Sequence, residues 1–427
     1  MKTMKLVSVS LLALACAGIA SAQTLVKVTG STAFRKATYF AIIDSLNSPK
    51  AAAIGGDTTN NDMSGAARAI IRGTLKSGPS AGVDVAYQLA WGGSVGGVQV
   101  VTQNLSTIPG TSFTSAQTWL SATNTLTPVS ITGGKIQGWT EGAAAFDAAS
   151  TADATNSDSF QSSTPFKSPV LVEENAAGGG VGVVQFLWVK GRKHPDFSNS
   201  TSYEGLTNVT ALQAQLLLAA GELPLSLFTG NASDIAYDVV LVGRNNDSGT
   251  RLDAEAEPGF GFGFGVENQY QPVISAGSIT GISNVGDVGY ASGGNVATAL
   301  KTPIASGARD DAGNIFVFVG YVGKGDAGTA ITGGAQALAY NGSTYYNNST
   351  ATYNDAAIQN GAYTFWAYEH AYYRSSLTGV KKNALDLMSN TLRGGSLAVN
   401  GEPSQSGIVL TSMGVNRGIE GGVVAPQ

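Results

Sequence analysis

The chain has 427 residues with 24 Lys or Arg and 29 Asp or Glu, so its formal net charge is −5 at pH 7. This acidic balance argues against nucleic acid and anionic membrane surfaces as partners. Only 12% of the residues are charged, against about 25% in an ordinary protein, and the 56 glycines are roughly twice the usual share. The length exceeds what one hydrophobic core usually organises, so we expect two lobes.

The N-terminus has the three parts of a secretory signal. Lys2 and Lys5 precede an apolar stretch at 6–20, which is too short for a membrane-spanning helix, and Ala20-Ser21-Ala22 is a small-x-small cleavage site. Cleavage there removes two lysines and no acids, so the chain that begins at Gln23 carries a net charge of −7. We expect the first 22 residues to be a signal peptide and the rest of the chain to be periplasmic or secreted.

Cys16 is the only cysteine and lies inside the predicted signal. The chain after the signal therefore has no thiol for a disulfide or for a cysteine-based metal site. Leu14 and Ala15 precede this cysteine, which leaves a lipidated Cys16 as an alternative to cleavage after Ala22.

Strand-like and helix-like segments alternate along the chain, which predicts an α/β fold. A short strand at 25–28 leads through a Gly/Ser/Thr turn into a helix at 33–46, and a strand at 84–91 runs into a glycine-rich loop at 92–97. Further strands are expected at 181–189, 237–241 and 315–322. Further helices are expected at 210–228, broken by Pro224, from 252 to 257, and at 375–392.

The most informative segment follows the strand at 237–241. Arg244 is followed by the turn Ser248-Gly249-Thr250, directly before the predicted helix at 252–257. A helix N-terminus offers free backbone N–H groups and the positive end of the helix dipole. The Ser and Thr hydroxyls can donate hydrogen bonds, and a guanidinium can bind two oxygens at once. The pattern therefore predicts a site for a tetrahedral oxyanion, and the turn at 29–34 predicts a second anion cradle.

Four motifs, in this order, resemble those of the periplasmic phosphate-binding proteins of ABC transporters, which are type II two-lobed solute receptors. The motifs are Gly30-Ser31-Thr32-Ala33-Phe34, Gly93-Ser94-Val95-Gly96-Gly97, Asn156-Ser157-Asp158 and Arg244-x-x-x-Ser248-Gly249-Thr250. The resemblance implies two α/β lobes joined by a hinge, each a mixed sheet flanked by helices. It places lobe I at 23–175 and 335–427, and lobe II at 176–334.

The resemblance also implies a function and a set of ligand-binding residues. The protein would bind inorganic phosphate by lobe closure and deliver it to a membrane ABC permease, as a monomer without catalysis, cofactor or metal. The implied ligands are Thr32, Ala33 and Ser94 from one lobe, Arg244, Ser248, Gly249 and Thr250 from the other, and Asp158. Because a carboxylate can only accept hydrogen bonds, Asp158 would admit hydrogen phosphate, which carries a proton, and reject sulfate.

The sequence departs from the family pattern at several places. The residue two past the arginine is commonly acidic in the family and is Asn246 here, so the support of Arg244 is not evident from the sequence. Extra sequence lies at 99–143 and at 340–356. Pro258 and the Gly/Phe run at 259–265 are expected to end the helix that follows the motif.

Other functions remain open from the sequence. The chain could be an envelope or surface protein on the same scaffold without phosphate transport, or a receptor for sulfate, molybdate or arsenate. Gly92-Gly93-Ser94-Val95-Gly96 also spells the Gly-x-Ser-x-Gly elbow of hydrolases, which would need a histidine base from His194 or His370. The pairs Glu173-Glu174 and Asp310-Asp311 are interpreted as solvated turn charges rather than as catalytic acids or calcium ligands.

Overall fold

The computed structural model describes residues 23–106, 118–142, 145–175, 179–198, 200–261, 265–266, 268–394 and 407–427. The predicted signal peptide with Cys16, and residues 262–264 of the Gly/Phe run, lie outside the described residues. Within that part of the chain, the helices all lack the combination of length and hydropathy that a membrane crossing needs.

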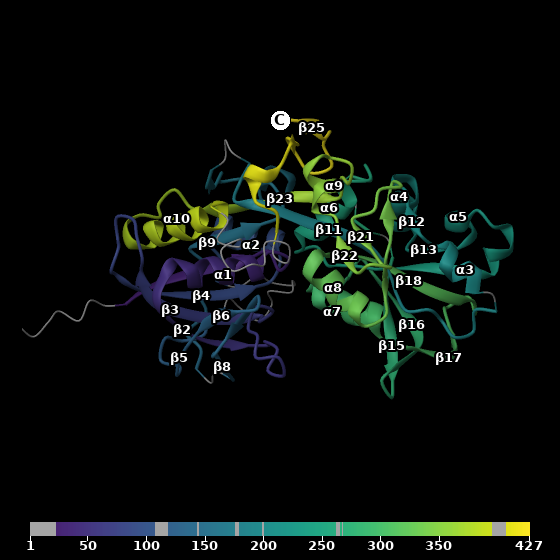
Figure 1. The fold of residues 1–427 in the computed structure, drawn as a ribbon, viewed down its shortest axis with the longest axis horizontal. Helices are drawn as coiled ribbons and strands as arrows, with labels where there is room; N and C mark the ends of the chain where they lie inside the picture. The colour runs from purple at the N-terminus through teal and green to yellow at the C-terminus, as the bar shows by residue number, and fades with distance from the viewer. Residues whose placement is uncertain are drawn as a thin grey trace, which may run out of the picture.

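One mixed sheet of 14 strands runs through the molecule, with helices on its faces (Figure 1). Its main path has the order β13-β14-β18-β11-β23-β9-β1-β4-β3-β2-β5. The fold is therefore mixed α/β, as the alternation of elements in the sequence predicts.

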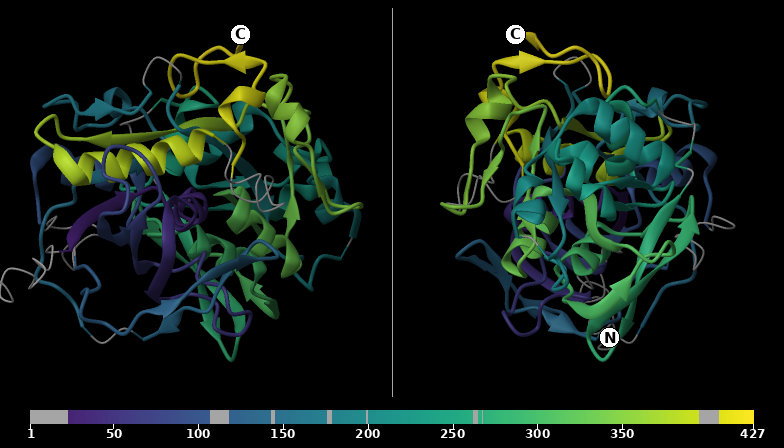
Figure 2. Two further views of the ribbon diagram at one scale, coloured as in Figure 1. Left: turned by 60° about the vertical axis from the view of Figure 1, so that its left-hand side comes forward. Right: turned by 90° about the vertical axis from the view of Figure 1, so that its right-hand side faces the viewer.

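The first group of strands lies on one side of the molecule with α1 and α10 (Figures 1 and 2). Its strands are β1 (Thr24–Gly30), β2 (Leu46–Ile54), β3 (Arg68–Leu75), β4 (Asp84–Trp91), β5 (Thr127–Pro128), β8 (Thr140–Glu141) and β9 (Ala154–Ser157). Its helices are α1 (Arg35–Ser45), α2 (Ser94–Gln103) and α10 (Gly379–Arg393). Strand β1 is central and pairs in parallel with β4 and β9.

The second group of strands lies on the other side (Figure 1). Its strands are β11 (Gly182–Lys190), β13 (Glu222–Pro224), β14 (Tyr237–Val242), β18 (Ile315–Gly323) and β19 (Gln336–Ala337). Helices in this part of the chain are α3 (Ser200–Gly205), α4 (Ala211–Ala220), α5 (Ser226–Thr229), α6 (Gly249–Ala256), α7 (Gly293–Lys301), α8 (Lys324–Thr332) and α9 (Asp355–Gln359). Strands β14 and β18 are parallel, and both are buried over nearly their whole length.

The remaining elements are strands outside the two groups and short 3₁₀ turns. Strands β6 (Ser130–Thr132) and β7 (Lys135–Gln137) form a hairpin, and β10 (Val172–Glu173) pairs with β23. A separate three-stranded sheet consists of β15 (Gln269–Ser275), β16 (Ser278–Gly286) and β17 (Ile304–Arg309). The other short strands are β12 (Asn208–Val209), β20 (Ala339–Tyr340), β21 (Tyr346–Asn347), β22 (Thr352–Tyr353), β24 (Val415–Asn416) and β25 (Ala425–Pro426). The 3₁₀ turns are η1 (Gln161–Ser163), η3 (Ala232–Ala236) and η4 (Leu410–Ser412).

Two strands join the groups. The start of β11 pairs with β23 (Trp366–Tyr373), and its end, from Phe186 onward, pairs with β18. Strand β23 in turn pairs with β11 through its first half and with β9 through its second half, from His370 onward. The chain therefore crosses between the two groups within β11 and β23.

The sequence predicted the longest elements well because their apolar patterns are strong. The continuous apolar run at 315–322 becomes β18, buried on both faces as expected for the middle of a sheet. In α10, Ala384, Leu385, Met388 and Leu392 form a buried stripe at helical spacing. The helix expected after Arg244 is α6, and it ends at Ala256, before Pro258, as predicted.

Several predictions at glycine, proline and charged positions were wrong. The loop expected at 92–97 is instead the start of α2, whose first residue is Ser94. The helical region expected at 210–228 is interrupted around Pro224, as α4 ends at Ala220 and α5 begins at Ser226. The interruption starts at Gly221, however, and Pro224 itself ends β13 at the edge of the sheet, where the missing N–H of proline is tolerated. His194 lies in the loop that follows β11 and is fully buried, and its Nε2 lies 2.9 Å from the carbonyl oxygen of Ala308. The acids Glu173 and Glu174 are paired with His370 and Lys382 rather than solvated in a turn.

Candidate functional site

The predicted motifs meet where the parallel strands β1, β4 and β9 reach their carboxyl ends. The Gly93 N–H donates to the Gly30 carbonyl at 3.0 Å, and the Ser31 N–H donates to the Asn156 carbonyl at 2.8 Å. Gly30 has a φ of +112°, and a Cβ there would lie 1.9 Å from the Asn156 oxygen. Only glycine permits this approach, which brings the three loops together at the place where ligands bind in α/β sheets.

Asp158 lies at the centre of this site. Its side chain accepts hydrogen bonds from the hydroxyl of Ser94 and from the hydroxyl of Thr250, the latter at 3.2 Å, while its own N–H donates to the Ser94 hydroxyl at 3.2 Å. All three residues are buried. Ser94 and Asp158 belong to the first group of elements and Thr250 to the second, so this carboxylate links the two.

The hydrogen bonds of Ser94 do not fit the hydrolase alternative. A Gly-x-Ser-x-Gly elbow needs its serine hydrogen-bonded to a histidine base. Here Ser94 is bonded to Asp158, while Nδ1 of His370 pairs with Glu173 and Nε2 of His194 with a backbone carbonyl. The geometry of a nucleophilic serine is not formed by these side chains.

The N-terminus of α2 is joined to the second group by backbone hydrogen bonds. The N–H groups of Val95 and Gly96 donate to the carbonyl of Asp247 at 3.0 and 3.2 Å. A Cβ on Gly93, whose φ is +110°, would lie 2.3 Å from the same carbonyl oxygen. The loop that carries the arginine motif is therefore pressed directly against the first turn of α2.

Arg244 is held by backbone carbonyls rather than by an acidic neighbour. Its Nε and Nη2 donate to the carbonyls of Tyr290 and Ala291 at 3.1 and 3.0 Å, and its side chain is buried. Nη1 has no hydrogen-bond partner among the described residues. Asn246, which stands where an acidic residue is common in the family, is not one of the two partners of the guanidinium; its side-chain amide donates to Asp287 at 3.1 Å.

The backbone of Arg244 is also fixed. Arg251 Nη1 and Gln269 Nε2 both donate to its carbonyl, at 3.3 and 3.1 Å, and its N–H donates to the Tyr321 hydroxyl at 3.2 Å. Arg251 itself pairs with Glu255 at 2.7 Å and with Asp287. The sequence analysis did not single out Arg251, although it directly follows Thr250.

Ser248 and Gly249 form the first turn of α6. The Ser248 side chain accepts the N–H of Arg251 at 3.2 Å and so acts as the N-cap. Gly249 lies against Asp158, because a Cβ built on it would be 1.7 Å from Asp158 Oδ1. A larger residue at this position would push the two groups of elements apart.

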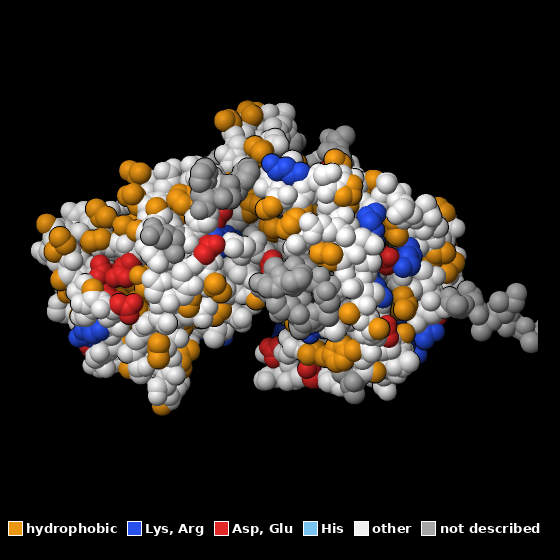
Figure 3. All heavy atoms as spheres, turned by 180° about the vertical axis from the view of Figure 1, so that it is seen from behind, with side chains coloured by type: hydrophobic (Ala, Val, Ile, Leu, Met, Phe, Trp, Pro, Cys, Tyr) orange, Lys and Arg blue, Asp and Glu red, His pale blue; other side chains and the backbone are white. Residues whose placement is uncertain are grey.

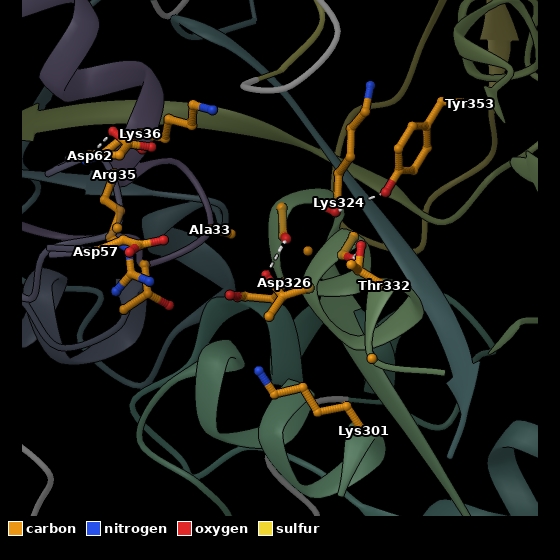
Figure 4. A pocket seen from close by; sticks show the side chains of 18 of the residues that line it. Ala33, Arg35, Lys36, Asp57, Asp62, Lys301, Lys324, Asp326, Thr332 and Tyr353 are labelled. Atoms are coloured by element: carbon orange, nitrogen blue, oxygen red, sulfur yellow. Dashed lines mark hydrogen bonds between the residues drawn. The ribbon is translucent and has the colours of Figure 1, made fainter. Parts of the chain in front are cut away.

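Thr32 and Ala33 lie on the wall of a cavity of about 860 Å³, whose lining includes none of the other predicted ligand residues, Ser94, Asp158, Arg244, Ser248, Gly249 and Thr250. The cavity is lined from both groups, and the molecular surface is hollowed between them (Figure 3). Figure 4 shows Arg35, Lys36 and Asp57 on one side and Lys301, Lys324 and Asp326 on the other. The structure thus places Ser94, Asp158, Gly249 and Thr250 in direct contact, whereas Thr32 and Ala33 line a cavity that these four residues do not line.

Burial controls the charges at the site. It raises the pKa of the Asp158 carboxyl, against the opposing effects of Ser94, Arg244 and Thr250. Burial also lowers the pKa of Arg244, an effect that the carboxylates of Asp326 and Asp158 oppose. Two neighbouring carboxyls, Asp253 and Glu369, have pKa values well above their usual range, first because of burial and next because of the charge of Asp158. A negative charge near Asp158 is therefore destabilised by burial and by the other carboxyls. It needs nearby hydrogen-bond donors to be stable there.

Comparisons with known proteins give similarity in structure only. Neither the family models nor the curated proteins searched match this chain. A Clostridium perfringens protein, assigned as a phosphate ABC transporter substrate-binding protein and solved with bound phosphate, aligns at 12% identity and a TM-score of 0.42, covering 87% of this chain and 98% of its own.

Two further solved structures are similar over most of their length. An ABC-type phosphate transport receptor from Vibrio cholerae aligns at 11% identity and a TM-score of 0.38, covering 88% of this chain and 98% of its own. PstS from Borrelia burgdorferi aligns at 12% identity and a TM-score of 0.36, covering 89% and 98%.

Proposed function

We propose that this protein is an extracytoplasmic receptor that binds inorganic phosphate between two lobes and passes it to a membrane ABC permease without chemical change. The observation that carries the proposal is the meeting of Ser94, Thr250 and Arg244 around Asp158, next to the first turns of α2 and α6. Hydroxyls, helix N-termini and one guanidinium are the donors that a dehydrated oxyanion needs.

Asp158 supports phosphate over other oxyanions. An ionised carboxylate cannot donate a hydrogen bond, so it can face an anion oxygen only if that oxygen carries a proton. Hydrogen phosphate has such a proton at neutral pH, whereas sulfate has none. A sulfate oxygen beside Asp158 would meet an unpaired negative charge, and this repulsion would provide the selectivity.

We propose that the two groups of elements are the two lobes, with lobe I at 23–175 and 335–427 and lobe II at 176–334 as a first division. The crossings in β11 and β23 then form the hinge. Strand β19 pairs with β11, and β20 pairs with β12, so residues 336–340 still belong to the second group. The chain therefore returns to lobe I within β23, later than the boundary at residue 335. Hinge closure around the anion would signal occupancy to the permease.

Isothermal titration calorimetry of residues 23–427, stripped of anions, tests the proposal. Phosphate, sulfate and molybdate are titrated at neutral pH in separate runs. We expect saturable heat from phosphate at one site per chain and none from sulfate. Sulfate binding of equal strength would remove Asp158 from its assigned role, and saturable binding of sulfate or molybdate alone would make the protein a receptor for another oxyanion.

One observation favours a second candidate, a structural envelope protein on the same scaffold that binds no phosphate. The N–H groups of Val95 and Gly96 are already bonded to Asp247, and the hydroxyls of Ser94 and Thr250 to Asp158. Donors that are satisfied within the protein do not need an anion. The absence of heat from phosphate, sulfate and molybdate in these titrations would favour this second candidate over the receptor.

A further inference from the structure

Three carboxylates gather at the amino ends of β14 and β18, away from the site described above. They belong to Glu222 in β13, Asp238 in β14 and Asp310 in the turn before β18, and each offers an oxygen within 4.8 Å of the others. Asp238 and Asp310 are buried, at 6% and 7% exposure. From the sequence, Asp310 was interpreted as a solvated turn charge; the structure contradicts this because the turn folds back onto Asp238.

The Asp310 side chain has one satisfied and one unsatisfied oxygen. Oδ1 accepts the N–H groups of Ala312 and Asn314 at 3.0 and 2.7 Å, which fixes the carboxylate in the turn. Oδ2 is buried and has no hydrogen-bond partner among the described residues. A buried carboxylate oxygen without a donor is costly unless a cation or a proton satisfies it.

The neighbours of the cluster do not neutralise it. The Asn314 amide donates to Asp238 Oδ2 at 2.7 Å, and Tyr270 is hydrogen-bonded to Glu222. None of the ion pairs among the described residues includes Glu222, Asp238 or Asp310.

We propose that Glu222, Asp238 and Asp310 bind a calcium ion. Calcium takes carboxylate and carbonyl oxygens at about 2.3–2.6 Å, so two oxygens that share one ion lie no more than about 5 Å apart, as these do. The three residues offer only oxygen, which favours calcium over zinc, whose usual ligands include nitrogen and sulfur. The ion would join β13, β14 and the turn that leads into β18.

The test uses residues 23–427 treated with a chelator and then titrated with CaCl₂, with thermal unfolding as the readout. For a dissociation constant near 10⁻⁴ M, 1 mM calcium would raise Tm by about 2 °C in a chain of this length. Terbium luminescence gives a second readout, since Tyr270 lies beside Glu222 and can sensitise a lanthanide bound there.

Two variants locate the ion. Asp310→Asn and Glu222→Gln should each abolish the Tm shift and the terbium signal, and Glu222 lies at the sheet edge, where the exchange is less disruptive to folding. Asp84→Asn is the control, because Asp84 also begins a strand but is paired with Arg72 at the surface, and it should keep both signals. A wild-type chain that gives neither signal, or variants that keep both, would overturn the proposal.

Discussion

The two ends of strand β14 have opposite chemistry. At its carboxyl end the chain passes into Arg244 and then into the first turn of α6, where the hydroxyls of Ser94 and Thr250 donate to the carboxylate of Asp158. At its amino end, about 20 Å away along the strand, Asp238 lies among carboxylates and the donors are few. The residues from Val239 to Val242 are apolar and buried, so the difference comes from Asp238 itself and from the segments that precede and follow the strand.

The direction of the parallel strands determines which kind of ion each end of the sheet can bind. Each parallel strand of the second group is followed by a helix, so its carboxyl end faces helix N-termini with their free N–H groups and positive dipole ends. The amino ends are reached by turns and by the edge strand β13, which present side-chain oxygens. An anion fits the first setting and a cation the second.

The largest expected effect concerns the carboxyl end. Arg244→Ala should weaken phosphate binding by at least about 2 kcal/mol, or roughly thirtyfold, because it removes a charge-assisted donor from a buried site. Calorimetry measures the change, and circular dichroism shows whether the variant is folded. Arg72→Ala is the control, since Arg72 is exposed and pairs only with Asp84. Unchanged affinity in the Arg244 variant would separate the guanidinium from the ligand.

Gly249→Ala tests whether the two groups of elements must touch at the site. The added Cβ would lie 1.7 Å from Asp158 Oδ1 and 2.6 Å from Ser159 Oγ, so closure would be blocked. We expect affinity to fall at least about tenfold and the phosphate-induced decrease in the radius of gyration, measured by small-angle X-ray scattering, to disappear. Gly418→Ala, where a Cβ meets nothing within 4 Å, should behave as the wild type. Normal compaction in the Gly249 variant would contradict the closed geometry.

Asp158→Asn tests the selectivity of the same end. The amide can donate a hydrogen bond, so a sulfate oxygen is no longer repelled. We expect the ratio of phosphate to sulfate affinity to fall by about tenfold, or 1.4 kcal/mol, measured by paired titrations at neutral pH. Because burial raises the pKa of Asp158, the wild type should also accept sulfate better as the pH is lowered. A selectivity that neither the variant nor low pH alters would exclude Asp158 as the discriminating group.

Local patterns predicted one end of β14 better than the other. Arg244 and the Ser-Gly-Thr turn are contiguous in the sequence, so their placement after a strand and before a helix could be predicted from hydrophobic runs and capping residues alone. The carboxylates at the amino end come from positions 222, 238 and 310, and only the strand order brings them together. No spacing rule connects Asp238 to Asp310.

Glycine patterns misled the prediction in the first group. The segment Gly93-Ser94-Val95-Gly96-Gly97 has low helix propensity and was predicted to be a loop. It nevertheless forms the first turn of α2, in which Gly97 lies against Gly30, where a Cβ would be 2.7 Å from the Gly30 Cα. This tertiary contact joins residues more than 60 positions apart, which local propensity does not record.

The smallest expected effect concerns the amino end of β14. It tests whether the negative charge of Glu222 destabilises the folded protein when no cation is present. The pKa of Glu222 is raised from 4.5 to about 7, so its stabilising contribution is complete below pH 4.5 and is lost as the pH rises through 7. Without calcium, Glu222→Gln should therefore raise Tm at pH 8, by about 1 °C because the site is half-exposed, and leave it unchanged at pH 4. Scanning calorimetry in chelator at both pH values measures this.

Glu204→Gln, at an exposed position, should give no such pH-dependent difference. If the Glu222 variant lowered Tm at pH 8 in chelator, the carboxylates would be stabilising one another through a shared proton or an unseen donor, and the two ends of β14 would not differ in charge as the geometry indicates.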